Sequence, residues 1–308
     1  MEQHSHILQL ISQILQLVVS GVTSGCIYAI VAIGFSIIYN STQVINFAQG
    51  EFVMVGAMVA AVLVATCSVL VAFPVAIAAG CFVGAVVALL ILIPLKRASV
   101  ITLIIITIGA SIMFQGLAQL FWGESGIRPP PFTGVVVPKT GEVIDRTFHF
   151  GGAVVQAQQV WVVVVTAVLV IGMQLFFRYS LIGKGMRACS INATGAKLVG
   201  ISVRKMILLS FVMAAGLGAI AGITVSPAFY AKCNMGTELG LKGFCAAVFG
   251  GLGNFGGGVA AGIILGIVES LTGGLLWSDY KDAIAFFILL AVLLIRPEGI
   301  LSRKRAEA

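Results

Sequence analysis

Long apolar runs without charge constrain this chain more than any other feature of its sequence. Between Glu2 and Lys96 the one formally charged side chain is Glu51, and residues 52–95 carry none. Several runs exceed the roughly 18 apolar residues that mark a membrane-spanning helix. A hydrophobic fraction of 59% and a mean hydropathy of +1.11 are also atypical of a soluble core. The sequence therefore predicts an all-α polytopic protein of a bacterial inner membrane.

The apolar segments predict about eight transmembrane helices in a single transmembrane domain that covers residues 1–308. They lie near residues 7–39, 44–66, 69–93, 100–122, 158–177, 206–230 and 283–296, with a further unit at 240–276. The first segment exceeds the about 20 residues of one straight crossing, so we expect it to tilt, to bend near Gly21 and Gly25, or to begin as a surface helix.

The unit at 240–276 is the least regular. Leu241–Phe249 is too short to span before it meets the glycine run at 250–258, after which a second helix runs to about Leu276. Irregular backbone at membrane depth is tolerated only inside protein or beside a watery cavity. The pattern therefore predicts a broken or re-entrant helix that faces a central path and returns to the side from which it entered.

Glycines recur at four-residue spacing, as in Gly258, Gly262 and Gly266, and again in the pairs Gly80/Gly84 and Gly218/Gly222. This spacing is typical of close helix packing in membranes. Gly251-x-Gly253-x-x-Gly256 also matches the dinucleotide-binding fingerprint, but no β-strand precedes it. We therefore interpret the glycines as packing positions.

The charges indicate orientation. Loop 178–205 carries six basic residues and no acidic one, whereas loop 123–157 balances three basic residues against three acidic ones. By the positive-inside rule the first is a cytoplasmic loop and the second an external loop, and the basic Arg303–Arg305 tail is also inside. Val135–Val137 and a Lys139–Gly141 turn predict a small hairpin in the external loop. The net charge of +7 is thus an orientation signal, and we expect no nucleic-acid partner.

Catalytic and cofactor motifs are absent from the sequence. It contains no Walker A motif, HExxH or GxSxG, and its six cysteines fit no zinc spacing. Polar residues within the apolar segments are expected to line a path or to bond between helices; these are Thr107, Ser111, Gln115, Asn254 and Glu269. For Glu269 we prefer a position near the outer interface, close to Lys281, over one in the pathway.

Glu51 lies in the motif Ile45-Asn46-Phe47-Ala48-Gln49-Gly50-Glu51. A carboxylate within the membrane costs about 2.5–3.5 kcal/mol on insertion scales, so such a residue indicates function. Alternatively, Glu51 lies at the membrane surface, where it caps or starts a helix.

Loop 178–205 mixes charges with small and apolar residues, including Leu198, Val199 and Ile201. This mixture favours a short helix that docks in a groove of a partner. The alternative is a connector with no role beyond topology.

These segments resemble the permease subunits of branched-chain amino acid ABC importers. Tyr28–Gly34 is similar to the first-span pattern of that family, and Ile45–Glu51 to its most specific signature. Loop 183–201 resembles the ATPase-coupling helix, and Gly250–Gly253 and Arg296–Ile300 resemble the late glycine run and the closing motif. The chain departs from the pattern at Gln49, where a histidine is usual.

The resemblance implies two groups of functional residues. Those of the translocation path or signature are Asn46, Phe47, Gln49, Gly50, Glu51, Gly251, Gly253 and Asn254. Those of ATPase coupling are Gly185, Arg187, Asn192, Ala196, Leu198, Gly200 and Ile201. The signature residues are expected either near the pathway or in support of the broken helix.

The resemblance also implies partners. A permease of this type would pair with a second, homologous permease subunit and two cytoplasmic ATP-binding subunits within membrane lipid, and would receive substrate from a periplasmic binding protein. It would be no enzyme, with no cofactor of its own, because ATP is bound by the partner subunits. The expected substrate is a branched-chain amino acid, with urea, amides and aromatic acids as alternatives.

Two other functions remain as competing hypotheses. A secondary transporter or channel would use Glu51 and Glu269 as ion-coupling carboxylates. An intramembrane enzyme would need a nucleophile or metal set that the sequence does not offer.

Overall fold

The computed structural model describes residues 2–92, 98–136, 143–150 and 152–275, together with Ala283, Phe286, Phe287, Leu290 and Leu294. The predicted span at 283–296 lies mostly outside these residues, and the Lys139–Gly141 turn lies entirely outside them. Lys96, Arg97, Lys281 and the closing segment from Arg296 also lie outside them.

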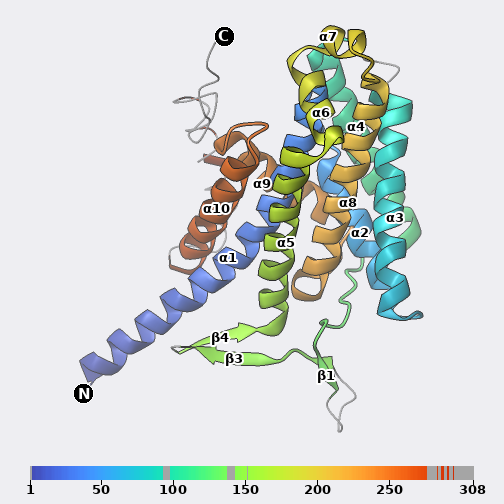
Figure 1. The fold of residues 1–308 in the computed structure, drawn as a ribbon. Coiled ribbons are helices and arrows are strands. Elements are labelled where there is room, and N and C mark those ends of the chain that lie inside the picture. The colour runs from blue at the N-terminus through green and yellow to red at the C-terminus, as the bar shows by residue number, and fades with distance from the viewer. Residues whose placement is uncertain are drawn as a thin grey trace.

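Helices dominate the described part of the chain (Figure 1). They are α1 (Glu2–Thr42), α2 (Gln49–Val64), α3 (Val69–Val87) with its π-helical extension Ala88–Leu92, α4 (Val100–Trp122), α5 (Ala157–Tyr179), α6 (Leu181–Ile191), α7 (Ala193–Leu198), α8 (Val203–Phe229), α9 (Met235–Phe249) and α10 (Phe255–Leu275). Six of them, α1, α3, α4, α5, α8 and α10, are long and apolar enough to cross a membrane. The all-α polytopic prediction is confirmed.

Helix α1 is continuous and slants across the bundle, with its N-terminal part projecting beyond the other helices (Figure 1). Its 41 residues correspond to roughly 60 Å at 1.5 Å per residue, well beyond one perpendicular crossing. Of the three expected arrangements, the tilted one agrees with this geometry. Gly21 and Gly25 do not interrupt the helix; they are contact positions.

The contact of α1 with α10 is the most extensive between helices. A Cβ added at Gly266 would overlap the backbone of Gly21 and Gly25, and one at Gly262 would lie 2.7–3.0 Å from backbone atoms of Gly25 and Ala29. The backbones of the two helices can approach this closely because neither carries a side chain there. The predicted packing role of Gly262 and Gly266 is confirmed.

Helix α8 is the central element on the other side of α1. It contacts α1, α2 and α3, and its middle turns are buried. Gly218 and Gly222 lie against Phe52 and Val53 of α2, while Gly84 of α3 lies against Ala215 of α8. The remaining predicted glycine pairs therefore pack helices as well.

Helices α9 and α10 form the predicted broken unit. After α8, residues 230–234 lead into α9, and a turn at 250–254 connects α9 to α10. Gly251 and Gly253 in this turn adopt φ of +86° and +88°, which favours glycine. The sequence placed the start of this unit at 240, and the structure corrects it to Met235. The added first turn contains Thr237 and Glu238, which interrupt the apolar pattern before residue 240.

The unit begins and ends at the same end of the bundle. Ala231, just before α9, pairs with Ile127, and Ser270, near the end of α10, donates a hydrogen bond to the carbonyl of Leu17. The turn in between lies at the opposite end, where Asn40 donates to the carbonyl of Gly253.

Two short hairpins mark the first of these ends, called here the hairpin end (Figure 1). Strand β1 (Val135–Val136) pairs with β2 (Val143–Ile144), and β3 (Thr147–Phe150) pairs with β4 (Ala153–Gln156), both antiparallel. The second hairpin was not predicted. It is held to α1 by hydrogen bonds from Ser12 to the Gly152 carbonyl and from the Val154 amide to Gln16. The opposite end carries α6 and α7 and is called the α6–α7 end.

Candidate functional site

The signature begins in a non-helical segment, residues 43–48, between α1 and α2. The Asn46 side chain accepts a hydrogen bond from the Ala48 amide (3.2 Å), and the Phe47 amide donates to Thr107 of α4 (3.2 Å). These bonds fix the approach of the chain to α2, which begins at Gln49. Thr107 thus ties α4 to the non-helical segment before α2, whereas the sequence predicted that it lines a path or bonds between helices.

Glu51 lies in the first turn of α2 and is 0% exposed. One of its oxygens, Oε1, accepts hydrogen bonds from Ser111 of α4 (2.7 Å) and Thr237 of α9 (3.2 Å). Glu51 therefore starts a helix, as in one expected alternative, but it is enclosed by three helices and has no free surface. Its position joins α2, α4 and α9.

Gln49 and Gly50 extend this junction to α1, α8 and α9. Gln49 donates to the Ala214 carbonyl of α8 (3.2 Å) and lies against Gly34 of α1. Gly50 lies against Gly236 and Gly240 of α9, where a Cβ would overlap the backbone. The signature therefore fixes the start of α2 against one face of α9.

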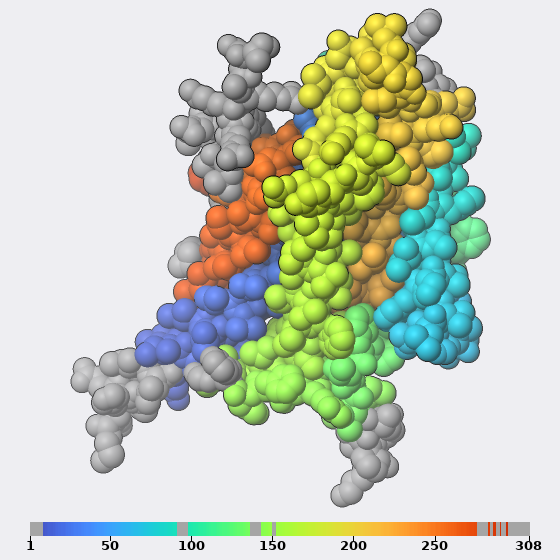
Figure 2. All heavy atoms as spheres, in the orientation of Figure 1, coloured from blue at the N-terminus to red at the C-terminus, as the bar shows by residue number. Residues whose placement is uncertain are grey.

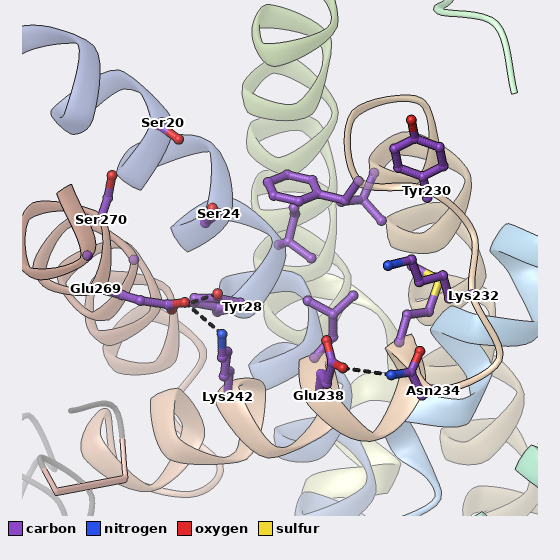
Figure 3. Close-up of a pocket in the computed structure, with 17 residues that line it drawn as sticks. Ser20, Ser24, Tyr28, Tyr230, Lys232, Asn234, Glu238, Lys242, Glu269 and Ser270 are labelled. Carbon is purple, nitrogen blue, oxygen red and sulfur yellow. Dashed lines mark hydrogen bonds and ion pairs between the residues drawn. The ribbon is translucent and has the colours of Figure 1, made fainter. Parts of the chain in front are cut away.

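The opposite face of α9 lines a cavity of about 450 Å³. Met235, Glu238, Leu239 and Lys242 follow the i, i+3, i+4, i+7 spacing of one helical face. The other walls come from α1, from α10 and from the end of α8 with residues 230–234 (Figure 3). The volume is in the range of small-molecule sites.

An ion pair crosses this cavity. Lys242 Nζ lies 2.6 Å from Glu269 Oε1, and the Tyr28 hydroxyl donates to Glu269 Oε2 at 2.7 Å (Figure 3). The two charged side chains are only 11% and 10% exposed. Glu269 therefore lines the cavity and pairs with Lys242. Its predicted neighbour at the outer interface, Lys281, lies outside the described residues. Charges inside a membrane bundle are rare and typically functional.

A second polar pair, formed by two more exposed residues, lines the same cavity. Asn234 donates to Glu238 at 2.8 Å, and Lys232 lies on the same wall (Figure 3). No sequence motif marked Lys232, Glu238, Lys242 or Tyr28 as site residues. Lys242 carried a usable signal, because a charged residue inside the predicted membrane unit at 240–276 indicates function.

The predicted residues of the glycine turn lie apart from Glu51. Gly251, Gly253 and Asn254 follow the end of α9, whereas Glu51 contacts its beginning, roughly 20 Å away at 1.5 Å per residue. Asn254 caps α10 by accepting from the Gly257 amide (3.2 Å). The signature and the turn therefore hold opposite ends of α9.

The predicted coupling residues lie in α6, in α7 and in the segment after them. Both helices are capped at their N-termini. The Ser180 side chain accepts a hydrogen bond from the Gly183 amide of α6 (3.1 Å), and the Asn192 side chain accepts one from the Gly195 amide of α7 (2.8 Å). Gly200, with φ of +84°, ends α7. The pair stands at the extremity of the molecule (Figure 2).

These residues divide by exposure. Asn192, Leu198 and Gly200 are exposed, and Leu198 is 84% accessible. Arg187 is exposed as well, but its guanidinium bonds the Phe177 carbonyl of α5. Gly185 and Ala196 are buried, and Ile201 is half-buried. The buried members position the helices, whereas the exposed ones form the surface.

Comparison with known proteins agrees with this architecture. The family described as "Branched-chain amino acid transport system / permease component" matches residues 17–293. The high-affinity branched-chain amino acid transport system permease protein LivH of Escherichia coli (strain K12) is 34% identical, over 95% of this chain and 97% of that protein. BraD of Pseudomonas aeruginosa, of the same description, is 31% identical over the same shares. The xylose/arabinose import permease protein XylH of Sulfolobus acidocaldarius is 30% identical over 54% of this chain and 42% of its own length.

Proposed function

This chain belongs to the permease family of branched-chain amino acid transport systems, and we propose that it forms the translocation path of an ABC importer for branched-chain amino acids. It is a multi-pass membrane protein, and its relatives are transport permeases. The proposal adds the bacterial inner membrane, a second permease subunit, two cytoplasmic ATP-binding subunits and a periplasmic binding protein. ATP would be bound by the partner subunits, because this sequence has no Walker A motif.

The α6–α7 surface is the observation that carries the proposal. Leu198 and Val199 are 84% and 75% exposed at the extremity of the bundle, next to basic residues such as Lys197. Exposed apolar side chains outside the membrane favour a protein partner. Because α6 packs on the end of α5 and contacts α8, displacement of the pair by an ATPase would be transmitted into the bundle.

The orientation of the bundle is consistent with such coupling. Arg178, Lys184, Arg187, Arg204 and Lys205 all belong to the α6–α7 end, which the positive-inside rule assigns to the cytoplasm. The hairpin end would then receive substrate from the binding protein. Each ATPase state must favour one conformation of the bundle for ATP to drive transport.

Extraction of the tagged protein from its native membrane in mild detergent tests the partners. Co-purification of a second permease with Walker-containing ATPases is the expected result. A homo-oligomer without ATPase subunits would overturn the proposal in favour of a secondary transporter or channel.

A substitution at the surface tests the coupling. Leu198→Glu should reduce ATPase co-purification or uncouple ATP hydrolysis from transport by about 10-fold or more, since a buried unpaired charge at an interface costs several kcal/mol. His149→Glu adds a carboxylate to the exposed β3 strand at the other end and is the matched control for ATPase co-purification. Equal behaviour of the two variants would remove the docking assignment.

A further inference from the structure

The cavity between α1, α9 and α10 has two different walls. Its charged lining consists of two lysines and two glutamates, Lys232, Lys242, Glu238 and Glu269, so the formal charges cancel. Its apolar lining includes Ile27, Val225, Phe229 and Leu239. Figure 3 shows the charged side chains and the apolar ones projecting into the same space from different elements.

Stability alone does not explain this arrangement. A buried ion pair is often no more stabilising than apolar residues of similar volume, because both charges lose hydration. The Lys242–Glu269 pair nevertheless borders an open volume of about 450 Å³ instead of closely packed side chains. A charged pair beside an unfilled cavity in a membrane bundle favours a ligand that carries complementary charges.

We propose that this cavity binds an apolar amino acid as its zwitterion during translocation, an assignment that rests on the proposed function. Lys242 and Lys232 face the α-carboxylate, Glu269 and Glu238 face the α-ammonium, and the apolar wall receives the side chain. Tyr28 holds the Glu269 carboxylate in place.

The equal numbers of lysines and glutamates in the cavity favour a ligand that carries both an α-carboxylate and an α-ammonium. A zwitterion replaces one ion pair by two complementary contacts and adds no net charge to the bundle. A ligand without the ammonium or without the carboxylate leaves one protein charge unpaired, which is costly in a low-dielectric site. Neutral urea offers neither charge.

Ligand binding to the purified full chain in lipid nanodiscs tests the assignment without the binding protein. L-Leucine is compared with leucinamide, which lacks the carboxylate, and with 4-methylpentanoate, which lacks the ammonium, by saturation-transfer NMR. We expect each analogue to bind about 10-fold or more weakly than L-leucine. Equal binding of all three, or no saturable binding of L-leucine, would overturn the assignment.

Exchange of the two charges separates a ligand site from a structural pair. The double variant Lys242→Glu/Glu269→Lys retains an ion pair but exchanges the positions of its two charges. The α-carboxylate and α-ammonium of the ligand would then have to exchange positions as well, which directs the ligand side chain away from the apolar wall. We expect a near-normal melting temperature and at least about 10-fold slower leucine uptake in the assembled importer. Glu124→Gln, an exposed carboxylate outside the cavity, is the control and should transport normally.

The outcomes distinguish failure of the proposed function from failure of the cavity assignment. Absence of ATP-dependent leucine uptake by the unmodified complex would overturn the proposed function, and the cavity assignment with it. Normal uptake by the exchanged variant would overturn the cavity assignment alone. If the exchanged variant does not fold, the comparison of the three ligands on the unmodified chain decides.

Discussion

Among the described residues of this bundle two carboxylates are buried, Glu51 and Glu269, and their surroundings differ. Glu269 is paired with Lys242 and bonded by Tyr28, whereas Glu51 accepts bonds only from the hydroxyls of Ser111 and Thr237 among the described residues. The second oxygen of Glu51 has no partner in that part of the chain. Burial removes Glu51 from water, and the two hydroxyl donors offset part of that cost. Loss of one hydroxyl therefore removes a large share of the hydrogen bonding that stabilises the buried carboxylate.

Ser111→Ala should therefore lower the free energy of unfolding by about 1–3 kcal/mol. Thermal unfolding of the detergent-solubilised protein measures the effect. In a Glu51→Gln background the same substitution should cost less, because no buried acceptor of the same strength remains. Ser210→Ala is the matched control, since within the described part of the chain the Ser210 hydroxyl donates to the Met206 carbonyl one turn away in α8 and to no other group. Equal losses at positions 111 and 210 would contradict the role of Ser111.

Helices whose ends are determined by residues adjacent in the sequence were predictable. The segment predicted at 100–122 is α4 (Val100–Trp122), and that at 158–177 is α5 (Ala157–Tyr179), because each is a long apolar run bounded by polar residues. The start of α9 was not predictable in this way. Its charged residues are acceptable in a buried helix only because α1 and α10 form a cavity beside them.

Part of the candidate site was likewise predictable from the sequence, and part was not. The signature around Glu51 is contiguous and could be recognised from one short motif. The cavity joins Tyr28 to Glu269, which are 241 residues apart in the chain, and Lys242 to Glu269 across a turn. Hydropathy and spacing contain no information on which distant charges meet, so these pairs required the structure.

The α1–α10 contact gives a prediction at the level of the element. Gly266→Ala would introduce a Cβ that overlaps the Gly21 and Gly25 backbone, so the two helices must separate. We expect a lower melting temperature and weaker transport. Gly116→Ala in α4 is the control, because its Cβ would meet nothing within 4 Å and alanine gains up to about 1 kcal/mol over glycine in a helix. A Gly266→Ala variant as stable as the control would contradict this contact.

At the scale of the whole molecule, function depends on which end of the bundle faces the cytoplasm. The α6–α7 end gathers the basic loop and the exposed apolar residues of α7, whereas the hairpin end carries loops of mixed charge. Residues 65–68, between α2 and α3, lie at the hairpin end, because Val64 and Val69 border one crevice with Pro129 and Phe132. Cys67 in this connection is exposed, whereas the other five cysteines are buried or half-buried.

Thiol labelling therefore tests the orientation. In spheroplasts, a membrane-impermeant maleimide should label Cys67 from outside, and Cys67→Ser should remove the signal. A cysteine introduced as Lys197→Cys in a Cys67→Ser background lies on the exposed surface of α7 and should react only after permeabilisation. The positive-inside rule requires this order, since the six basic residues of loop 178–205 remain in the cytoplasm. The reverse order would invert the bundle, direct α6 and α7 away from any cytoplasmic ATPase and exclude the coupling mechanism.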